Sequence, residues 1–211
     1  ARQHPPGFSR RFLLAAGLGA LAAPAAQAQG TYPTRPVTII VPYPAGGASD
    51  IGARLLATEL AKALGQPVVI DNVGGAGGAV GVQKLLRAPA DGYTLLYGAL
   101  SETVLVPLIN PAANYRLEDM AAIAFAGATP AAFVTRPDFP ASSMAELLEL
   151  ARQKPGKYSY GSPGIGTFQH LVAETVKLKT GTFLLHIPYR GGSNIMTDVV
   201  AGQIDVGVTT A

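Results

Sequence analysis

The sequence predicts an α/β protein built on parallel, doubly wound sheets. Three observations lead to this class: short runs of β-branched and apolar residues, glycine-rich turns directly after them, and amphipathic segments that follow the turns. Because this order recurs along the chain, we expect parallel strands with helices on both faces of each sheet. Ligands of such sheets bind at the carboxyl ends of the strands.

Residues 1–28 have the three-part pattern of an export signal. Arg10 and Arg11 precede an apolar run, and Ala26-Gln27-Ala28 is a small-x-small cleavage site. The Ser9–Leu14 stretch resembles a twin-arginine signal, and an ordinary secretory signal with two adjacent arginines is the alternative. The run is too short and too rich in Ala for a membrane span. We therefore expect cleavage after Ala28, a periplasmic location and no membrane insertion of the mature protein.

The composition excludes several kinds of site and partner. The chain has 211 residues, no Cys, and 16 basic against 13 acidic side chains. The missing cysteines exclude disulfides and Cys-based metal sites within this sequence. The leader holds Arg2, Arg10 and Arg11 and no acid, and removing these three from 16 leaves 13 basic residues, equal to the acids. No Lys/Arg cluster remains, so nucleic acid is not an expected partner.

The first strand, turn and helix are expected within Val37–Leu64. Val37–Val41 is an uninterrupted apolar run, typical of a strand buried on both faces. Prolines and glycines in Pro42–Gly47 end the strand and turn the backbone. Ser49 and Asp50 are good helix caps, and Gly65 is a natural stop. The inner helix face is expected to carry Ile51, Leu55, Leu56, Leu60, Ala63 and Leu64.

Two more strand-and-turn units follow. Pro67–Asn72 is expected to be a second buried strand, and the glycine-rich Gly74–Gly81 leads into a helix. Tyr93–Tyr97 is the third expected strand. Ser101, in the strand-end loop Gly98–Thr103, is a candidate cap for the helix after it. The loops at these strand ends should share one edge of the sheet: 42–50, 72–78 and 98–103.

The second half is expected to form another lobe. Ala121–Gly127 and Ala131–Thr135 are apolar runs expected to be strands that cross into it. Ser142 or Ser143 should cap a helix that carries Met144, Leu147, Leu148 and Ala151 and ends at Pro155-Gly156. A strand, a loop, a helix and a last strand are expected near the end, over 183–188, 189–192, 193–200 and 204–208.

Tyr158–Leu178 repeats the opening unit. A short strand leads into the glycine-rich loop Ser162–Gly166, and Thr167 is the expected cap of the next helix. His170 and Glu174 are expected on its outer side. The expected inner face consists of Phe168, Leu171, Val172 and Leu178.

Motifs that would identify a cofactor, a nucleophile or a metal site are absent, because the residues do not have the spacing that these motifs require. Gly164-x-Gly166 has Gln169 at the third glycine position of a dinucleotide fingerprint, and the stretch 161–167 lacks a P-loop lysine. No Gly-x-Ser-x-Gly nucleophile elbow exists. His170 and His186, the only histidines of the mature part, are not spaced as a zinc pair on one helix turn. Ser162 has no evident partner to activate it.

Ordered motifs along nearly all of 32–211 resemble the substrate-binding receptors of tripartite tricarboxylate transporters, the TctC or Bug family. They are Tyr32-Pro33-x-x-Pro36-Val37, Val41-Pro42-Tyr43-Pro44-Ala45-Gly46-Gly47-x-x-Asp50, Gly65-Gln66-Pro67-Val68-Val69, Gly75-Ala76-Gly77-Gly78, Asp91-Gly92-Tyr93-Thr94-Leu95, Ser162-x-Gly164-x-Gly166-Thr167-x-x-His170-Leu171, His186-x-Pro188-Tyr189-Arg190-Gly191-Gly192, and Asp198-x-x-x-Gly202-Gln203-x-Asp205.

The resemblance implies a two-lobed periplasmic-binding-protein fold of type II, the Venus-flytrap arrangement, with a doubly wound mixed sheet in each lobe. Lobe 1 is expected over 32–125 and lobe 2 over 126–211. Because such receptors usually return to the first lobe, we expect the C-terminal part of the fold to be missing from this sequence.

The resemblance also implies a site between two loops. One ligand carboxylate would be held by the Pro42–Asp50 loop, partly through ordered waters, and the other lobe would hold the ligand through the Ser162–His170 loop. Both loops lead into helix starts with unpaired N–H groups and a positive dipole end. The candidate ligand-binding residues are Tyr43, Ala45, Gly46, Gly47, Asp50, Ser101, Ser162, Gly164, Gly166, Thr167 and His170.

The expected function is that of a monomeric carrier that delivers a small organic carboxylate to membrane permease subunits. Di- and tricarboxylates and amino-acid-like acids are the expected ligands, with no catalytic residue, metal or cofactor. Two alternatives stay open: a receptor that signals to a membrane sensor, and a periplasmic hydrolase, against which the missing nucleophile–base pair argues.

Overall fold

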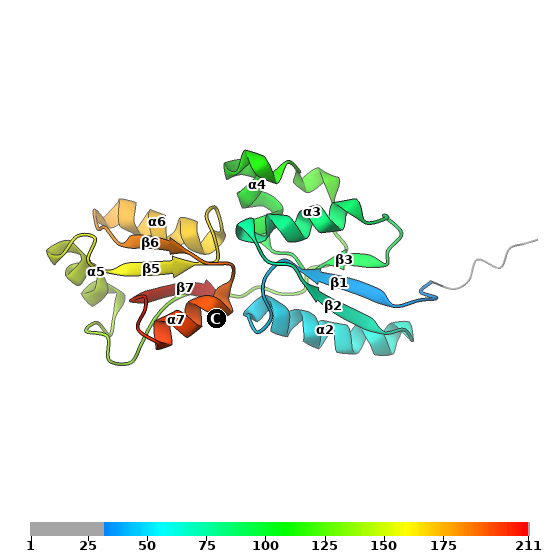
Figure 1. Cartoon of the computed structure of the whole chain (residues 1–211), viewed down its shortest axis with the longest axis horizontal. Helices are drawn as coiled ribbons and strands as arrows, with labels where there is room; N and C mark the ends of the chain where they lie inside the picture. The colour runs from blue at the N-terminus through cyan, green and yellow to red at the C-terminus, as the bar shows by residue number, and fades with distance from the viewer. Residues whose placement is uncertain (1–31, 211) are drawn as a thin grey trace, which may run out of the picture. The chain divides into compact units, whose positions relative to one another are not determined.

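The computed structural model describes residues 32–210, so the expected export signal lies outside the described residues. The first lobe holds a parallel sheet of order β2-β1-β3. Helices α2 and α3 lie on its opposite faces (Figure 1). The elements of the first lobe are β1 (Val37–Val41), α2 (Ala48–Leu64), β2 (Val68–Asn72), η2 (Ala76–Gly78), α3 (Ala79–Arg87), β3 (Thr94–Leu96), η3 (Ser101–Leu105), α4 (Val106–Ile109), η4 (Pro111–Ala113) and η5 (Leu117–Asp119).

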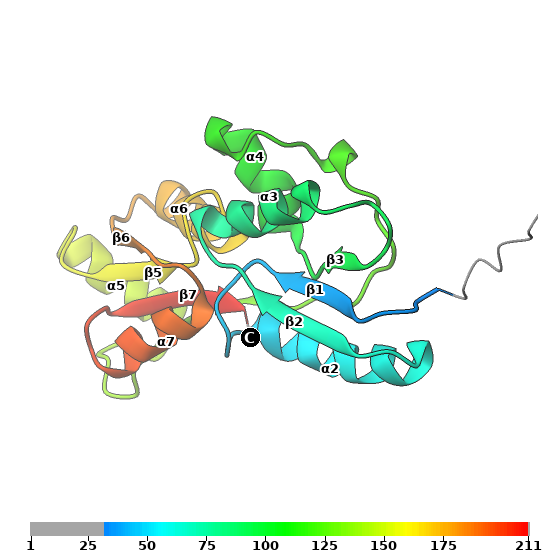
Figure 2. The ribbon, with the colours of Figure 1, turned by 45° about the vertical axis from the view of Figure 1, so that its right-hand side comes forward.

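The second lobe holds a mixed sheet of order β4-β7-β5-β6. Strands β5, β6 and β7 are parallel, and β4 pairs antiparallel with β7. Helices α5 and α6 share one hydrophobic core with this sheet, while α7 packs on the other face (Figure 2). The elements are β4 (Ala131–Thr135), α5 (Met144–Gln153), β5 (Ser159–Ser162), α6 (Phe168–Thr180), β6 (Leu185–Pro188), α7 (Gly192–Val200) and β7 (Val206–Thr210).

Strand β1 is the buried centre of the first sheet, as predicted. Its Ile39 and Val41 pack against Ala53 and Ala57 of α2. Strand β2 was expected to be buried but lies at the sheet edge, where Val69 is half exposed. An edge strand pairs on one side only, which the apolar sequence of β2 does not reveal.

The predicted inner face of α2 is largely wrong, although Leu60, one of its predicted members, does pack against the core. Ala53 and Ala57 face the sheet, whereas Ile51 and Leu55 are exposed. A stripe of alanines lets a helix approach a sheet closely, and periodicity alone favoured the larger side chains. The predicted face of α6 is also wrong: Ala173 is buried and Leu178 is 85% exposed.

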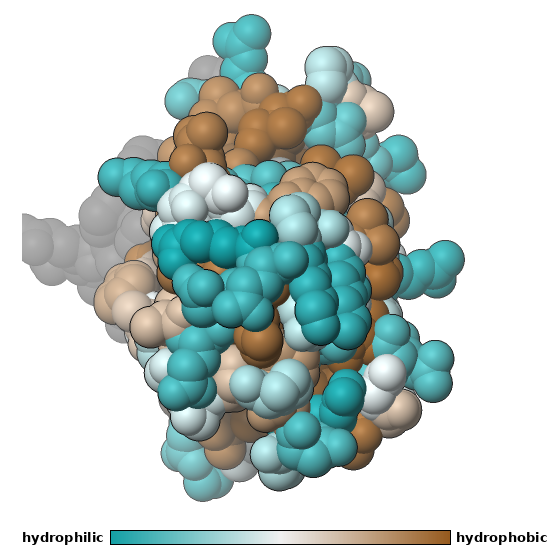
Figure 3. Space-filling model, turned by 90° about the vertical axis from the view of Figure 1, so that its left-hand side faces the viewer, coloured by the Kyte–Doolittle hydropathy of each residue, from teal (hydrophilic) through white to brown (hydrophobic). Residues whose placement is uncertain are grey.

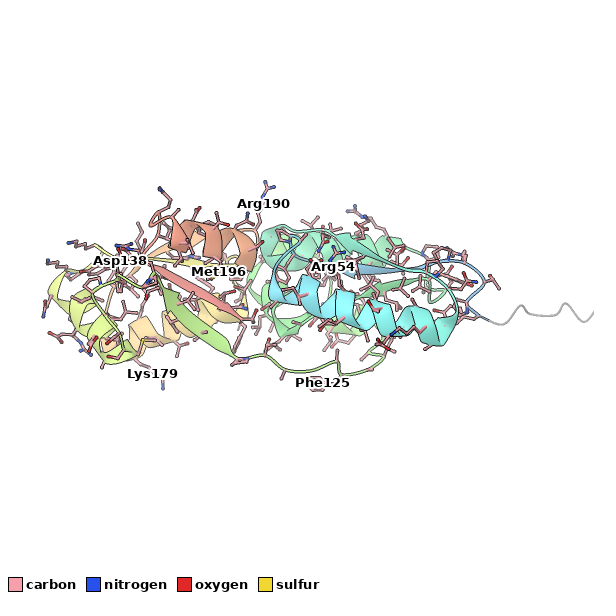
Figure 4. The ribbon with its side chains drawn as sticks, turned by 90° about the horizontal axis from the view of Figure 1, so that it is seen from below. Arg54, Phe125, Asp138, Lys179, Arg190 and Met196 are labelled. Carbon is pink, nitrogen blue, oxygen red and sulfur yellow. The ribbon has the colours of Figure 1, made fainter. Side chains whose placement is uncertain are left out.

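Residues 121–127 do not form the strand that was expected. The stretch 121–130 has no helix or strand, and Phe125 within it is 84% exposed. Figure 4 shows the Phe125 side chain pointing away from the ribbon. An apolar run becomes a strand only where a neighbouring strand can pair with it, and none of the described residues pairs here.

The exposed face of the second lobe seen in Figure 3 is hydrophilic at its centre. Helix α5 carries an exposed ion pair between Glu149 and Arg152. Its start follows the prediction, because Ser143 caps it by accepting a hydrogen bond from the N–H of Glu146. Leu147 and Ala151 form its buried side.

Candidate functional site

Two helices, one in each lobe, begin with the same local device. Gly46 and Gly166 both have φ +83°, a left-handed conformation that favours glycine. In the first lobe, the N–H of Gly46 donates to Asp50 Oδ2 at 2.9 Å. In the second, the N–H of Gly166 donates to His170 Nδ1 at 3.2 Å. Each acceptor lies four residues after its glycine and holds the loop against the helix start.

Asp50 therefore holds the loop rather than capping α2. The helix begins at Ala48, and Gly47 precedes it without a side-chain cap. The Asp50 carboxylate also accepts from Arg54 Nε at 3.0 Å and from Asn72 Nδ2 at 3.0 Å. The Arg54 guanidinium beside it is the main cause of its lowered pKa, although burial works in the opposite direction. Its charge is thus compensated inside the first lobe.

The start of α6 is not as open as predicted. Thr167 caps it, as expected, by accepting from the N–H of His170. The N–H of Phe168 donates to Ser101 Oγ at 2.9 Å. Ser101 was expected to cap the helix after it. Instead, it lies inside the helical turn η3 and caps a helix of the other lobe. With Gly166 bonded to His170, most of the predicted anion-binding N–H groups of α6 are occupied.

The starts of α2 and α7 are open. Neither Gly47 nor Gly191 supplies a side-chain cap. Among residues 32–210, the N–H groups of Gly47, Ala48 and Ser49 have no hydrogen-bond partner, and neither do those of Gly192, Ser193 and Asn194. Each helix end thus carries several unsatisfied donors and the positive end of its dipole.

These two open ends lie next to each other. A Cβ placed on Gly47 would be 3.9 Å from the backbone N of Ser193. A Cβ placed on Gly191 would be only 2.6 Å from Pro44 Cδ, so the loop before α7 touches the loop before α2. Two positive dipole ends at this distance repel each other unless an anion lies between them.

A buried carboxyl group supports the first-lobe loops. Glu102 is fully buried, accepts from the N–H of Ala99, and accepts from the Tyr43 hydroxyl at 2.9 Å. Burial raises the pKa of Glu102 to about 7, although its hydrogen bonds work against that rise. Burial and the Glu102 charge raise the pKa of Tyr43 well above its usual range. The Tyr43 hydroxyl also lies 3.3 Å from the carbonyl of Gly77.

A second polar cluster lies beneath α6. Ser162 Oγ and His186 Nε2 are 2.8 Å apart, so Ser162 does have a histidine partner, contrary to the prediction. The rings of His186 and His170 lie 4.4 Å apart, and His186 stacks on Tyr160 at 4.7 Å. Burial lowers the pKa of His170 and lowers that of His186 to about 4. Both rings are therefore neutral near pH 7.

The inward side of α6 is polar where it meets this cluster. Glu174 was expected on the outer side but accepts hydrogen bonds from the Tyr160 hydroxyl and from Lys177. Gln169 is buried on the same helix, and its carboxamide oxygen has no partner within the described residues. The spacing of apolar residues could not predict this inward face of α6, because polar side chains form it.

A cavity of about 450 Å³ is lined in part by Tyr189, which belongs to the loop before α7. Its size is typical of small-molecule sites. The lining residues are Ala76, Gly77, Ile109 and Asn110 of the first lobe and Gly164, Ile165, Pro188 and Tyr189 of the second. A Cβ placed on Gly164 would lie 2.9 Å from Gly77 Cα, so the two lobes meet backbone to backbone at the cavity wall.

The predicted site residues divide into three groups. Gly46, Gly47 and the exposed Ala45 belong to the open start of α2, and Gly164 lines the cavity. The supporting residues are Tyr43, Asp50, Ser101, Ser162, Gly166, Thr167 and His170, whose polar groups bond within the protein. The prediction missed Glu102, Ile109 and the start of α7. The Tyr189–Gly192 turn, a strand-end glycine pair before a helix, was the one available signal for the last of these.

Within residues 32–210, no group of three or more His, Asp or Glu side chains is placed to hold a metal ion. No helix of that same part is both long enough and apolar enough to cross a membrane.

Comparison with known proteins decides the family. The family model described as "Tripartite tricarboxylate transporter family receptor", TctC, matches residues 52–211. The chain belongs to this family. Two relatives of the TctC receptor come from Bordetella pertussis. One, described as a UPF0065 protein, is 38% identical over 180 residues, which are 85% of this chain and 56% of the relative. The other, protein BugT, is 38% identical over 176 residues, covering 82% and 54%.

Solved structures agree with this TctC assignment. A structure described as a periplasmic transporter is 38% identical, with a TM-score of 0.81, and the match covers 85% of this chain and 60% of that one. Rpa4515 of R. palustris with adipate is 29% identical, with a TM-score of 0.77, and 85% and 60% are covered. MatC of Rhodopseudomonas palustris with bound malate is 28% identical, with a TM-score of 0.79, and 85% and 61% are covered. The chain thus spans somewhat more than half the length of these relatives.

Proposed function

We propose that this TctC receptor captures a small organic carboxylate in the periplasm and delivers it to the membrane permease of a tripartite transporter. The carboxylate binds between the lobes, which we place on either side of residue 125. Binding involves no bond making or breaking. The single observation that carries the proposal is the meeting of two uncapped helix starts, those of α2 and α7.

The geometry favours an anion for a physical reason. Each helix end carries about half a positive charge from its aligned peptide dipoles. The nearest carboxylate, that of Asp50, is already compensated by Arg54 and Asn72. A ligand carboxylate would accept from N–H groups of Ala48, Ser49 and Ser193, directly or through water, and would remove the repulsion between the two ends.

The relatives support this class of ligand. Rpa4515 was solved with adipate and MatC with malate, both organic carboxylates. Our proposal moves the second half of the anion site from the start of α6, where sequence reasoning placed it, to the start of α7. The α6 loop then supports the site, because its N–H groups already bond to Ser101 and His170.

A hydrolase is the second candidate, since Ser162 and His186 form a serine–histidine pair. We disfavour it because Ser162 is fully buried and His186, with its pKa lowered to about 4, is a weak base. Incubation with carboxylate esters distinguishes the two: release of alcohol that is lost in the Ser162→Ala variant would indicate hydrolysis.

A proline substitution at the start of α2 tests the proposed site. Ala48 is the first residue of α2, where proline is tolerated and removes an N–H that has no intrahelical partner. In the full-length protein, Ala48→Pro should lower carboxylate affinity about tenfold or more, because a hydrogen bond to a charged group contributes about 1.5–3 kcal/mol. Calorimetric titration measures this.

The matched control is Met144→Pro, the same change at the first residue of α5, whose start is capped by Ser143. It should leave affinity unchanged. If Ala48→Pro binds the carboxylate as tightly as Met144→Pro does, the start of α2 does not bind the ligand and the proposed site is wrong.

A further inference from the structure

One buried carboxyl group touches the loops that follow all three strands of the first lobe. Glu102 packs so closely on Gly78, in the loop after β2, that a Cβ placed on Gly78 would lie 2.6 Å from Glu102 Cβ. Its carboxyl group also bonds to the N–H of Ala99, in the loop after β3, and to the Tyr43 hydroxyl, in the loop after β1. The position of each loop thus depends on this side chain.

No cation compensates Glu102. Within residues 32–210 it makes no ion pair, and the titratable groups that face it are the hydroxyls of Tyr43 and Tyr115. The Tyr115 hydroxyl donates to the backbone carbonyl of Glu102, so it is not available to the carboxyl group. A fully buried carboxylate without a cation is unfavourable, and burial accordingly raises the pKa of Glu102 to about 7.

The hydrogen bonds around Tyr43 differ between the two protonation states. Tyr43 Oη lies 2.9 Å from Glu102 Oε2 and 3.3 Å from the carbonyl oxygen of Gly77. The hydroxyl has one proton, so beside an ionised Glu102 it can donate to only one of these oxygens. A protonated Glu102 supplies the second proton, because its O–H donates to Tyr43 Oη and Tyr43 then donates to Gly77. Only the neutral acid completes both hydrogen bonds.

Gly77 is a place where a small displacement matters. It lines the cavity of about 450 Å³. A Cβ placed on it would lie 3.3 Å from the carbonyl oxygen of Ile165 and 3.3 Å from Thr167 Cγ2, both in the second lobe. A movement of Gly77 therefore changes the cavity wall and the contact between the lobes together.

We propose that Glu102 is a positioning residue of the binding site, which in its protonated form holds the Tyr43 loop and the Gly77 wall in the arrangement that binds the ligand. Ionisation draws the Tyr43 proton away from Gly77 and places a negative charge beneath loops that must accept an anion. Both effects weaken binding, so the ligand and the proton each raise the affinity for the other. The inference rests on the proposed function, because it takes the ligand to be an anion held by the first-lobe loops.

Calorimetric titration of the full-length protein between about pH 6.5 and 8.5 tests the inference. The probes are a panel of mono- and dicarboxylates that includes malate, adipate and benzoate, whose carboxyl groups are ionised over that range. The pKa values of Asp50, His170 and His186 are all lowered, so these side chains do not titrate there. The wild type should bind its tightest probe about tenfold or more weakly at the upper pH than at the lower one.

Substitutions separate positioning from mere packing. Glu102→Gln imitates the neutral acid, because its amide oxygen accepts from the N–H of Ala99 and its NH₂ group donates to Tyr43. Its affinity should equal that of the wild type at about pH 6.5 and stay constant to about 8.5. Glu102→Ala has no donor and should bind weakly at every pH. Glu118→Gln is the matched control, because Glu118 is exposed in η5, and it should keep the pH dependence of the wild type.

A measurement on the wild type checks the coupling without relying on a variant. Titration at about pH 7.5 in two buffers with different enthalpies of ionisation gives the number of protons taken up on binding, which should be most of one proton. Equal pH profiles for the wild type and Glu102→Gln, or binding without proton uptake, would overturn the inference and leave the proposed function intact. Absence of binding by every probe at every pH would contradict both.

Discussion

At the scale of single residues, much of the site depends on side chains that bond to the protein rather than to solvent. Ser101 is the clearest case. Its hydroxyl belongs to η3 of the first lobe, yet it accepts from the N–H of Phe168 at the start of α6. A sequence contains the serine but not the helix end that it will meet, so only its local capping role could be predicted.

Ser101→Ala should lower the free energy of unfolding by about 1–3 kcal/mol, because the Phe168 N–H loses its acceptor in a partly buried place. Denaturant unfolding of the full-length protein measures this. Ser142→Ala serves as the control, since its hydroxyl bonds to Glu146 at the exposed surface. Equal effects of the two changes would contradict a role for Ser101 in holding α6.

Glu102 makes stability depend on pH in a direction opposite to that of most carboxylates. Its pKa rises from 4.5 to about 7 on folding, so the unfolded chain loses this proton at lower pH than the folded one. Its contribution to stability is therefore complete below about pH 4.5 and is lost as pH rises through about 7. Glu102→Gln cannot ionise and keeps the hydrogen bond from Ala99.

The stability of Glu102→Gln relative to the wild type should therefore increase between about pH 5 and 8, by up to about 3 kcal/mol. Urea unfolding at a series of pH values measures the difference. A constant difference across that range would show that Glu102 is already ionised in the folded protein at low pH.

At the scale of elements, α2 and α6 begin with equivalent glycines and differ in what holds them. Asp50 holds Gly46 with a compensated anion, whereas His170 holds Gly166 with a neutral ring nitrogen. Protonation of His170 at Nδ1 would remove that acceptor. The groups that face His170 are the His186 ring, Glu174 and Lys177, and burial outweighs the favourable Glu174 charge.

Because the pKa values of His170 and His186 are lowered on folding, their contribution to stability is complete above about pH 6.5 and is lost as the pH falls below it, for His186 as it approaches about 4. We expect His170→Asn to show a smaller loss over this range than the wild type, since its side-chain oxygen accepts at any pH. His170→Ala, without an acceptor, should be less stable than His170→Asn even at pH 8. Identical pH profiles for wild type and His170→Asn would rule out the ring as the sensitive group.

The positions of the helices and strands were easier to predict from the sequence than the sides of the helices that are buried. Strand β1, the glycine turns and the Thr167 and Ser143 caps follow from local chemistry that a sequence displays. The buried faces of α2 and α6 do not, because an alanine stripe packs one helix and polar side chains pack part of the other. The run over 121–127 was predicted as a strand for lack of information about pairing partners.

At the scale of the whole molecule, the proposed site depends on contacts between lobes that no sequence pattern contains. Gly164 touches Gly77, Gly191 touches Pro44, and Gly47 approaches Ser193. These contacts bring the start of α7 to the start of α2, whereas the sequence repeat favoured α6 as the partner. The resemblance predicted the periplasmic-binding-protein fold correctly. The loops before α6 and α7 both contact the first lobe, through Gly164 and Gly191 respectively.

A crystal structure of the full-length protein, with the carboxylate that binds it most tightly in a calorimetric screen, locates the bound anion. We expect the carboxylate within hydrogen-bond or single-water distance of the N–H groups of Ala48, Ser49 and Ser193. A carboxylate held instead by the Gly166–Thr167 start of α6, or remote from both α2 and α7, would contradict it.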